Sequence, residues 1–301
     1  MYIAQRRLFT ETGGKFNDKV SCIISKIHGK YNIKESFGIF GAMSSTKVTE
    51  IAENIKENGY YIFEDKLPDN VVNEITKFSR EQPARILDFS KHVTFTEEEF
   101  LIDEENILSP KYSFKHDRLI RNKNIQSIVF DENLLHIAQE YLEVKPIVDA
   151  VSLWWSAPFD KKGTSAAAQE FHFDMDRIKF LKFFIYLTDV GPDNGPHCYV
   201  PKSHKILPKE LRKDGRYSDE TIEKHFGKHL EICKPKATMM FVDTRGFHKG
   251  KPLIKGERLL FQMEFTNSLL GQKVHEFKSN FIIDKAKKEK YKRTYQLIKL
   301  N

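Results

Sequence analysis

The chain has 301 residues, enough for one large or two ordinary domains, and its 24 Phe and 11 Tyr exclude a disordered protein. Its 49 Lys and Arg against 42 Asp and Glu give a net charge of +7, which does not by itself identify a partner. Three cysteines without a CxxC spacing exclude a disulfide scaffold and a cysteine zinc knuckle. No apolar run predicts a membrane span and no secretion signal precedes the polar start, so we expect a cytoplasmic protein.

The first part of the chain predicts helices. Residues 1–45 show little periodicity, and we interpret them as an N-terminal extension. Apolar side chains then recur at helical spacing in three segments, which indicates amphipathic helices. These segments begin at Thr46, Asp69 and Asp131, and a short strand, Tyr60–Phe63, separates the first two.

After Pro146 the pattern changes to short β-type runs separated by Gly, Pro, Asn and Asp. Helices first and strands later indicate an α+β arrangement, with helices packed on one face of a mainly antiparallel sheet system. The last segment, Asp284–Lys299, is rich in lysine and predicts a terminal helix with a solvated basic face. The expected strands are Ile147–Ser156, Glu170–Asp174, Arg177–Leu187, His197–Val200, His229–Cys233, Ala237–Val242 and Arg258–Phe265.

A histidine two positions before a carboxylate occurs twice, as His172-x-Asp174 and as His229-x-Glu231. Composition alone predicts about 1.5 such matches, so the tripeptide proves nothing without its context. Alternate side chains of an extended strand share a face, so His172 and Asp174 would project together. We interpret His229 and Glu231 as structural residues, because no further anchor follows them at a suitable spacing.

The context of the first tripeptide favours a metal site. Iron bound by two histidines and one carboxylate keeps coordination positions open for a cosubstrate and oxygen. His248, at the end of another expected strand, is a candidate third ligand. Arg258 opens a strand whose alternation places it with Gln262 and Glu264, opposite an apolar face. An arginine in such a cavity suits a dicarboxylate, because guanidinium pairs with a carboxylate through two hydrogen bonds.

Several motifs in order resemble the phytanoyl-CoA dioxygenase family of Fe(II)/2-oxoglutarate-dependent oxygenases, over about residues 47–265. The resemblance implies a double-stranded β-helix, a cupin-like jelly-roll barrel with supporting N-terminal helices. It divides the chain into an extension (1–45), a catalytic domain (46–268) and a basic helical tail (269–301). The front segment Asn54–Phe78 also resembles the family. Three motifs lie between His172/Asp174 and His248/Arg258, and they are Tyr186-Leu187-Thr188-Asp189-Val190, Asn194-Gly195-Pro196 and Val200-Pro201-Lys202-Ser203-His204.

By this resemblance, His172, Asp174 and His248 would ligate iron, and Arg258 would hold the distal carboxylate of 2-oxoglutarate. A carboxylate at position 174 favours oxygenation, because halogenating relatives carry a small residue there. Many members have a hydroxyl residue two positions after the second histidine, where this chain has Gly250. The candidates for the missing contact, which the sequence does not rank, are Lys179, Thr188 and Gln262.

The implied activity uses Fe(II), 2-oxoglutarate and O2 to hydroxylate a small metabolite, with release of succinate and CO2. Positive charge around the metal segment, from Lys161, Lys162, Arg177 and Lys179, favours a substrate with a phosphate or carboxylate. We interpret His197 as a packing or surface residue. Two alternatives remain: a non-catalytic jelly-roll module that binds a metal or ligand, and a nucleic-acid-acting oxygenase that lacks any recognisable nucleic-acid motif.

Overall fold

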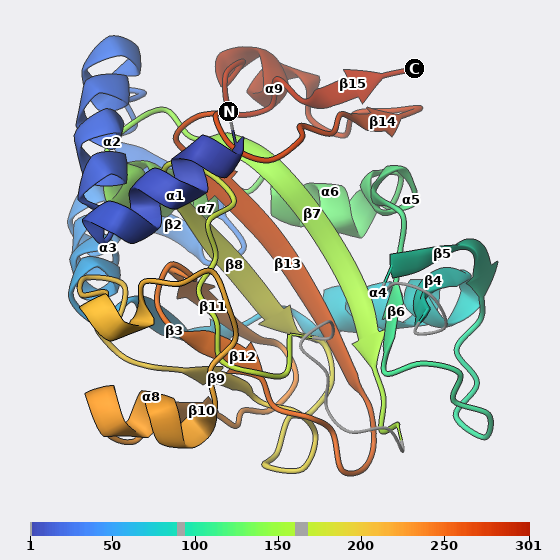
Figure 1. The fold of residues 1–301 in the computed structure, drawn as a ribbon. Helices are drawn as coiled ribbons and strands as arrows, with labels where there is room; N and C mark the ends of the chain where they lie inside the picture. Colours follow the sequence, from blue (N-terminus) through green and yellow to red (C-terminus); the bar gives the residue numbers. More distant parts are fainter. Residues whose placement is uncertain (1, 89–93, 160–167) are drawn as a thin grey trace.

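The computed structural model describes residues 2–88, 94–159 and 168–301 (Figure 1). An eight-stranded antiparallel sheet, the major sheet, forms its centre. In spatial order its strands are β3 (Tyr60–Lys66), β11 (Thr238–Val242), β8 (Phe180–Tyr186), β13 (Arg258–Thr266), β7 (Ile147–Ser156), β6 (Lys111–Ser113), β4 (Ala84–Asp88) and β5 (Thr94–Phe100).

A three-stranded minor sheet packs against one face of the major sheet. It consists of β10 (Leu230–Ile232), β9 (His197–Tyr199) and β12 (His248–Gly250), in that order. An apolar cluster joins the sheets, with Phe184 and Tyr186 on the major side and Tyr199 on the minor side. Two facing antiparallel sheets are the expected jelly-roll layout, although they do not close into a barrel.

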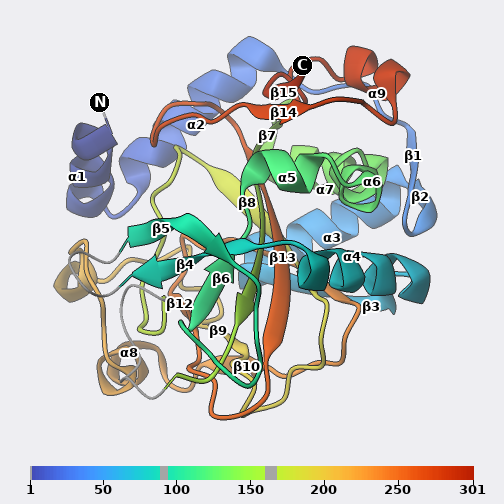
Figure 2. The same ribbon diagram turned by 90° about the vertical axis from the view of Figure 1, so that its right-hand side faces the viewer.

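Helices cover the opposite, outer face of the major sheet (Figure 2). The face is apolar enough to hold them, because Val48 of α3 and Leu134 of α7 join the same buried cluster as Phe183 and Met263. The α-helices of the described residues are α1 (Tyr2–Thr12), α2 (Lys15–His28), α3 (Ser45–Asn58), α4 (Asp69–Glu81), α5 (His116–Ile120), α6 (Lys123–Val129), α7 (Glu132–Leu142), α8 (Asp219–Phe226) and α9 (Lys285–Lys290). Of these, α1 and α8 do not belong to this layer, because Phe9 and Ile222 pack in a separate cluster with Cys198 and Phe247.

The alternation predicted for β13 is present. Leu259, Phe261 and Met263 are fully buried in the helix-side cluster. Arg258 and Glu264 lie in the other set of alternate positions, which faces the minor sheet. One strand therefore serves the hydrophobic core on one side and carries polar groups on the other.

The helices expected from Thr46, Asp69 and Asp131 are confirmed as α3, α4 and α7, with Asp131 as the N-cap of α7. Glu170–Asp174 is not a strand, because only isolated bridges of Phe171 and His172 form there. The terminal helix is also shorter than predicted. It ends before the fully buried Tyr291, and the chain continues to β15 (Ile298–Leu300), which pairs with β14 (Phe277–Ser279).

Residues 2–45, where the sequence shows little periodicity, contain regular secondary structure. They form α1, α2 and a hairpin of β1 (Glu35–Gly38) with β2 (Gly41–Ser44). Their periodicity is weak because several buried positions are polar, including Gln5, Asn17 and Ser21. The division of the chain at residues 45 and 268 stays a prediction. Within the described residues, no helix has the length and apolarity needed to cross a membrane.

Candidate metal centre

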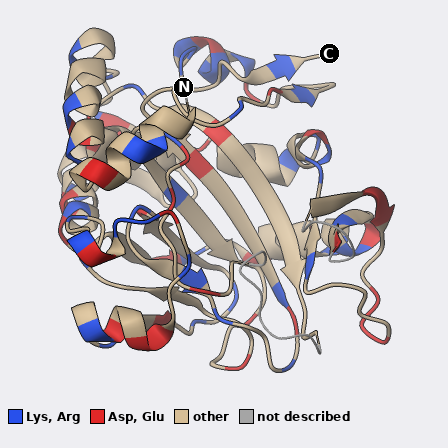
Figure 3. Cartoon of the chain, in the orientation of Figure 1, with Lys and Arg blue, Asp and Glu red and all other residues tan. Residues whose placement is uncertain are grey.

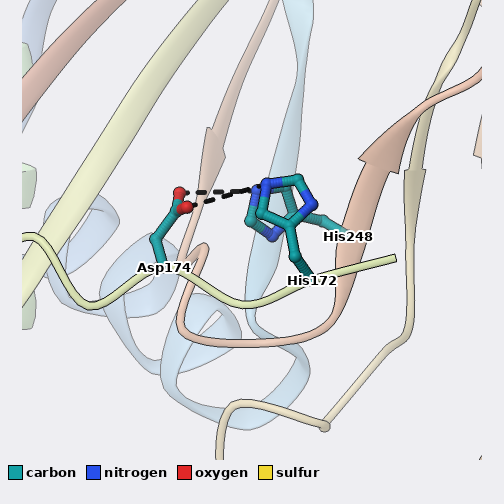
Figure 4. Close-up of side chains that lie close together, drawn as sticks. All are labelled: His172, Asp174 and His248. Atoms are coloured by element: carbon teal, nitrogen blue, oxygen red, sulfur yellow. Dashed lines mark ion pairs between the residues drawn. The ribbon is translucent and has the colours of Figure 1, made fainter. Parts of the chain in front are cut away.

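His172 and His248 come from segments far apart in sequence that the backbone holds together. His172 N–H donates to His248 O at 3.0 Å, and His248 N–H donates to His172 O at 2.8 Å. Asp174 N–H donates to Thr244 O at 2.8 Å, which ties the carboxylate residue to the loop before β12. The main chain therefore fixes all three candidate ligands, and their side chains point toward one another (Figure 4).

The three side chains are close enough to share one metal ion. His248 Nε2 lies 3.4 Å from Asp174 Oδ2, and His172 Nε2 lies 3.7 Å from Asp174 Oδ1. One ligand atom from each residue falls within 4.8 Å of the others. All three are buried or nearly so, which excludes most competing water.

Hydrogen bonds select the ring nitrogen that each histidine presents. His172 Nδ1 lies 2.9 Å from Glu170 O, and His248 Nδ1 lies 2.9 Å from Gly246 O. A carbonyl only accepts, so Nδ1 carries the proton in both rings and the Nε2 lone pairs face the carboxylate. Burial and the nearby His248 lower the pKa of His172 to about 3. Two imidazoles and one carboxylate fit the facial triad of an Fe(II) site.

Lys182 is a functional neighbour that our reading of the sequence missed. Its Nζ lies 2.7 Å from Asp174 Oδ2 and 2.9 Å from Asp176 Oδ2. Burial alone would raise the pKa of Asp174, but above all the charge of Lys182 holds it well below its usual value. The sequence could have indicated Lys182, because it is the single charged residue in the apolar run that forms the fully buried strand β8.

Arg258 lies beside the triad, next to Gly250. A Cβ on Gly250 would stand 3.6 Å from Arg258 Nη2, so a hydroxyl residue there would reach the guanidinium. Arg258 is 6% exposed, and it donates to Gly195 O and, at 3.2 Å, to Ser156 Oγ. In the sheet register, Arg258 pairs with Ser156, which pairs with Lys111. Burial and the charge of Arg258 lower the pKa of Lys111 to about 8.

The three residues considered for the contact missing at Gly250 lie in different places. Lys179 lines a separate cavity of about 310 Å³, with its Nζ 5.1 Å from the Tyr141 ring. Thr188 Oγ1 accepts the main-chain N–H of Leu259 at 3.1 Å and ties the segment after β8 to β13. Gln262 is on the same strand as Arg258, in a cavity beside Lys182. Of the three, the structure brings Gln262 to the face that carries the triad.

His197 is a second neighbour of the triad, although we interpreted it as a packing or surface residue. Its ring centroid lies 5.5 Å from that of His248, in a stacked arrangement. Its Nε2 is buried and has no hydrogen-bond partner among the described residues. Burial and the charge of Arg258 lower the pKa of His197, so it stands beside His248 as a neutral ring.

His229 and Glu231 also meet a third potential ligand, which the sequence did not indicate. Cys198 pairs with Glu231 across β9 and β10, and the three groups fall within 4.8 Å of one another. However, Lys251 Nζ lies 2.9 and 3.0 Å from the two oxygens of Glu231. Burial raises the pKa of the Cys198 thiol to about 12, which keeps it protonated.

Comparisons with known proteins identify the family of the chain. The family model of phytanoyl-CoA dioxygenase (PhyH) matches residues 55–249, more than half of the chain. The solved structure of the non-haem, α-ketoglutarate-dependent epimerase SnoN from nogalamycin biosynthesis aligns with a TM-score of 0.52 and 13% identity. That alignment covers 73% of this chain and 83% of SnoN.

EctD from S. alaskensis with bound Fe aligns with a TM-score of 0.53 and 15% identity, over 79% of this chain and 83% of EctD. At these identities the two structures support the shared fold alone. A search of curated protein sequences found no match. From the family match, the chain belongs to the phytanoyl-CoA dioxygenase family and is a 2-oxoglutarate-dependent non-haem iron dioxygenase.

Proposed function

We propose that His172, Asp174 and His248 hold Fe(II), that Arg258 holds the distal carboxylate of 2-oxoglutarate, and that the enzyme hydroxylates a small metabolite. The observation that carries this proposal is the arrangement of the triad and Arg258. Two imidazole Nε2 atoms and a carboxylate converge, and Arg258 is next to Gly250, two residues after the second histidine. Iron and cosubstrate would therefore bind side by side.

Bound Fe(II) and 2-oxoglutarate supply the oxidising chemistry: one oxygen atom of O2 enters a substrate C–H bond, the other enters succinate, and CO2 leaves. The chain supplies position and charge. The Nδ1 hydrogen bonds orient His172 and His248 before any ligand binds. Lys182 keeps Asp174 ionised. Burial of these side chains excludes bulk water from the reacting groups.

We assign to Ser156 and Lys111 the cosubstrate contact that a hydroxyl residue makes in other members. They stand in one row with Arg258 across three neighbouring strands. The Lys111 ammonium lies 4.5 Å from the centre of the Trp154 ring and forms no ion pair among the described residues. An unpaired cation beside an arginine suits a carboxylate of the cosubstrate.

The structure gives less support to an anionic substrate. Arg177 is engaged with Asp149, through contacts of 2.5 and 2.9 Å. Lys179 lines another cavity, and Lys161 and Lys162 lie outside the described residues. The proposed substrate is therefore a small polar metabolite without a required phosphate or carboxylate.

The basic tail gives little support to a nucleic-acid substrate. Lys290 Nζ lies 2.8 Å from Glu132 Oε1, and Lys292 Nζ lies 3.2 Å from Glu289 Oε2. Part of the positive charge of the tail is therefore already matched within the chain. Exposed pairs of this kind contribute little to stability, but they reduce the field that would attract a phosphate backbone.

The test is conversion of 2-oxoglutarate to succinate by the purified chain, with and without Fe(II) and O2. We expect succinate to form slowly without substrate and only when both are present. Arg258→Lys keeps the charge but loses the bidentate geometry, so we expect the KM for 2-oxoglutarate to rise at least about tenfold. Absence of iron-dependent succinate from the wild-type chain would refute the proposal.

A further inference from the structure

His197 lies directly across from Gly250 in the minor sheet. The two residues are register partners in the antiparallel pair of β9 and β12, so they share one face of the sheet, and His248 shares it too. A Cβ on Gly250 would stand 3.6 Å from Arg258 Nη2, so this face is turned toward Arg258. Because residue 250 has no side chain, the His197 ring is the side chain that this register pair presents there.

The surroundings of His197 fix the position of its ring. The main-chain N–H of His197 donates to the Tyr186 hydroxyl at 2.9 Å, which holds the start of β9 against the major sheet. The centroid of the ring lies 5.5 Å from that of His248 and 5.3 Å from that of Phe184. His197 is 6% exposed. The ring therefore stands between the two sheets, beside the triad.

Two buried nitrogens here have no hydrogen-bond partner among the described residues. One is His197 Nε2, and the other is Arg258 Nε. The other guanidinium nitrogens of Arg258 are engaged, because they donate to Gly195 O and, at 3.2 Å, to Ser156 Oγ. A buried polar group without a partner costs free energy, and such groups are rare in folded proteins. Two of them close together indicate that a ligand supplies the acceptor.

The missing acceptor should be an anion. Arg258 opens β13 and Lys111 opens β6, at the end of the major sheet where Figure 3 shows basic positions. Arg258 is buried and forms no ion pair among the described residues. Burial of a charge is costly unless an opposite charge compensates it. A carboxylate from outside the chain would satisfy the charge and both nitrogens.

We propose that His197 donates a hydrogen bond from Nε2 to the distal carboxylate of 2-oxoglutarate, the carboxylate that Arg258 also holds. This inference rests on the proposed function and adds a residue that selects the cosubstrate. A carboxylate only accepts, so the ring carries its proton on Nε2 when the cosubstrate is bound. Ser156 and Lys111 approach the carboxylate from the major sheet, and His197 approaches it from the minor sheet. The two carboxylate oxygens have enough lone pairs for these donors.

The test compares two ligands that differ at one end. 2-Oxoglutarate has the distal carboxylate, whereas 2-oxopentanoate has a methyl group in its place. Calorimetry on the Fe(II)-loaded chain without oxygen measures both dissociation constants. We expect His197→Leu to weaken 2-oxoglutarate binding at least about tenfold and 2-oxopentanoate binding less than about twofold, because only the first ligand loses a hydrogen bond to a charged group. Equal losses, or an unchanged affinity for 2-oxoglutarate, would overturn the proposal.

Two further variants separate the hydrogen bond from packing. A glutamine amide nitrogen reaches about as far from the main chain as His197 Nε2, whereas an asparagine amide is shorter by one carbon. We therefore expect His197→Gln to keep the affinity for 2-oxoglutarate within about threefold, and His197→Asn to lose as much as His197→Leu. Equal affinities in the Gln and Asn variants would contradict the hydrogen bond. This pair decides the question if His197→Leu does not fold.

The matched control is His136→Leu. His136 lies in α7, on the outer side of the major sheet, and is 2% exposed. Its Nδ1 is also buried without a partner among the described residues. We expect both ligands to bind within about twofold of the wild-type affinity. A loss of 2-oxoglutarate binding as large as in His197→Leu would show that removal of any buried ring has this effect.

The wild-type chain separates this inference from the proposed function. If it binds 2-oxoglutarate no more tightly than 2-oxopentanoate, nothing holds the distal carboxylate, and the assignment of Arg258 fails. If the wild type prefers 2-oxoglutarate and His197→Leu keeps the full preference, the proposed function stands and the role of His197 is rejected.

Discussion

The chain contains two clusters built on a histidine two positions before a carboxylate, and they differ in what surrounds them. The first cluster is His172, Asp174 and His248, and the second is Cys198, His229 and Glu231. In both, the ligand atoms gather within 4.8 Å. Close spacing of potential metal ligands is therefore found in both clusters and does not show which of them binds a metal.

The two clusters differ in the protonation of their ligand groups and in their ion pairs. In the first cluster, both histidines donate through Nδ1 to carbonyl oxygens and present free Nε2 atoms. In the second, the Cys198 thiol stays protonated and Lys251 occupies both oxygens of Glu231. A metal entering the second cluster would have to remove a proton and displace an ammonium, which explains why only the first has the chemistry of a metal centre.

The largest effect should come from removing a ligand of the first cluster. We expect His172→Ala to weaken Fe(II) binding at least about 100-fold and to abolish succinate formation, because two ligands cannot hold the ion. Iron content after gel filtration and succinate yield measure this change. Retention of one tightly bound iron per chain would show that the metal lies elsewhere.

A structural change behind the first cluster should have the next largest effect. Phe9 of α1 is 5% exposed and packs 5.8 Å from the ring of Phe173, between the first two ligands. We expect Phe9→Ala to lower the free energy of unfolding by about 3 kcal/mol, through lost burial and a cavity. Urea unfolding measures the loss, and weaker Fe(II) binding should accompany it. An unchanged midpoint would mean that α1 does not support the cluster.

The reactivity of the Cys198 thiol tests whether the second cluster can bind a metal. With a pKa of about 12, Cys198 has almost no thiolate at pH 8, whereas Cys22 is exposed. We expect iodoacetamide to modify Cys198 at least about 100-fold more slowly than Cys22, and the Cys198 rate to rise as the pH increases toward 12. Mass spectrometry of peptides reads both rates. Fast labelling of Cys198 would mean that its thiol is ionised and able to bind metal.

The smallest effect is expected from the second cluster itself. His229→Ala removes its histidine, and we expect succinate formation to stay within about twofold of the wild-type rate. The iron content should remain one per chain. A large loss of either would show that the two clusters are coupled, and the distinction between them would then fail.

The sequence predicted the fold class and the helices α3, α4 and α7 because hydrophobic spacing is a local property. It also predicted that Arg258 and Gln262 share a face of β13, since strand alternation is fixed by the backbone. It did not predict α1 and α2, whose buried positions include Gln5 and Asn17 and so lack an apolar pattern.

Pairwise contacts in three dimensions were harder to predict. Lys182 and Asp174 are separated by a turn, and nothing local indicates that their charges meet. Cys198 joins His229 only through strand pairing. Lys179 was close to the metal segment in sequence but faces another cavity, because the chain turns between Asp174 and β8. Sequence distance was a poor guide to which polar groups share a site.

The paired main-chain hydrogen bonds between His172 and His248 have a consequence for how iron enters. Small zinc modules have no stable fold until their ion arrives, because binding must offset the entropy of ordering the chain. Here the two ligand segments are held together by peptide groups, so ordering is completed during folding. We expect the metal-free chain to be a folded species that takes up Fe(II) afterwards and releases it reversibly. The iron content would then follow the supply of Fe(II), independently of how much folded protein is present.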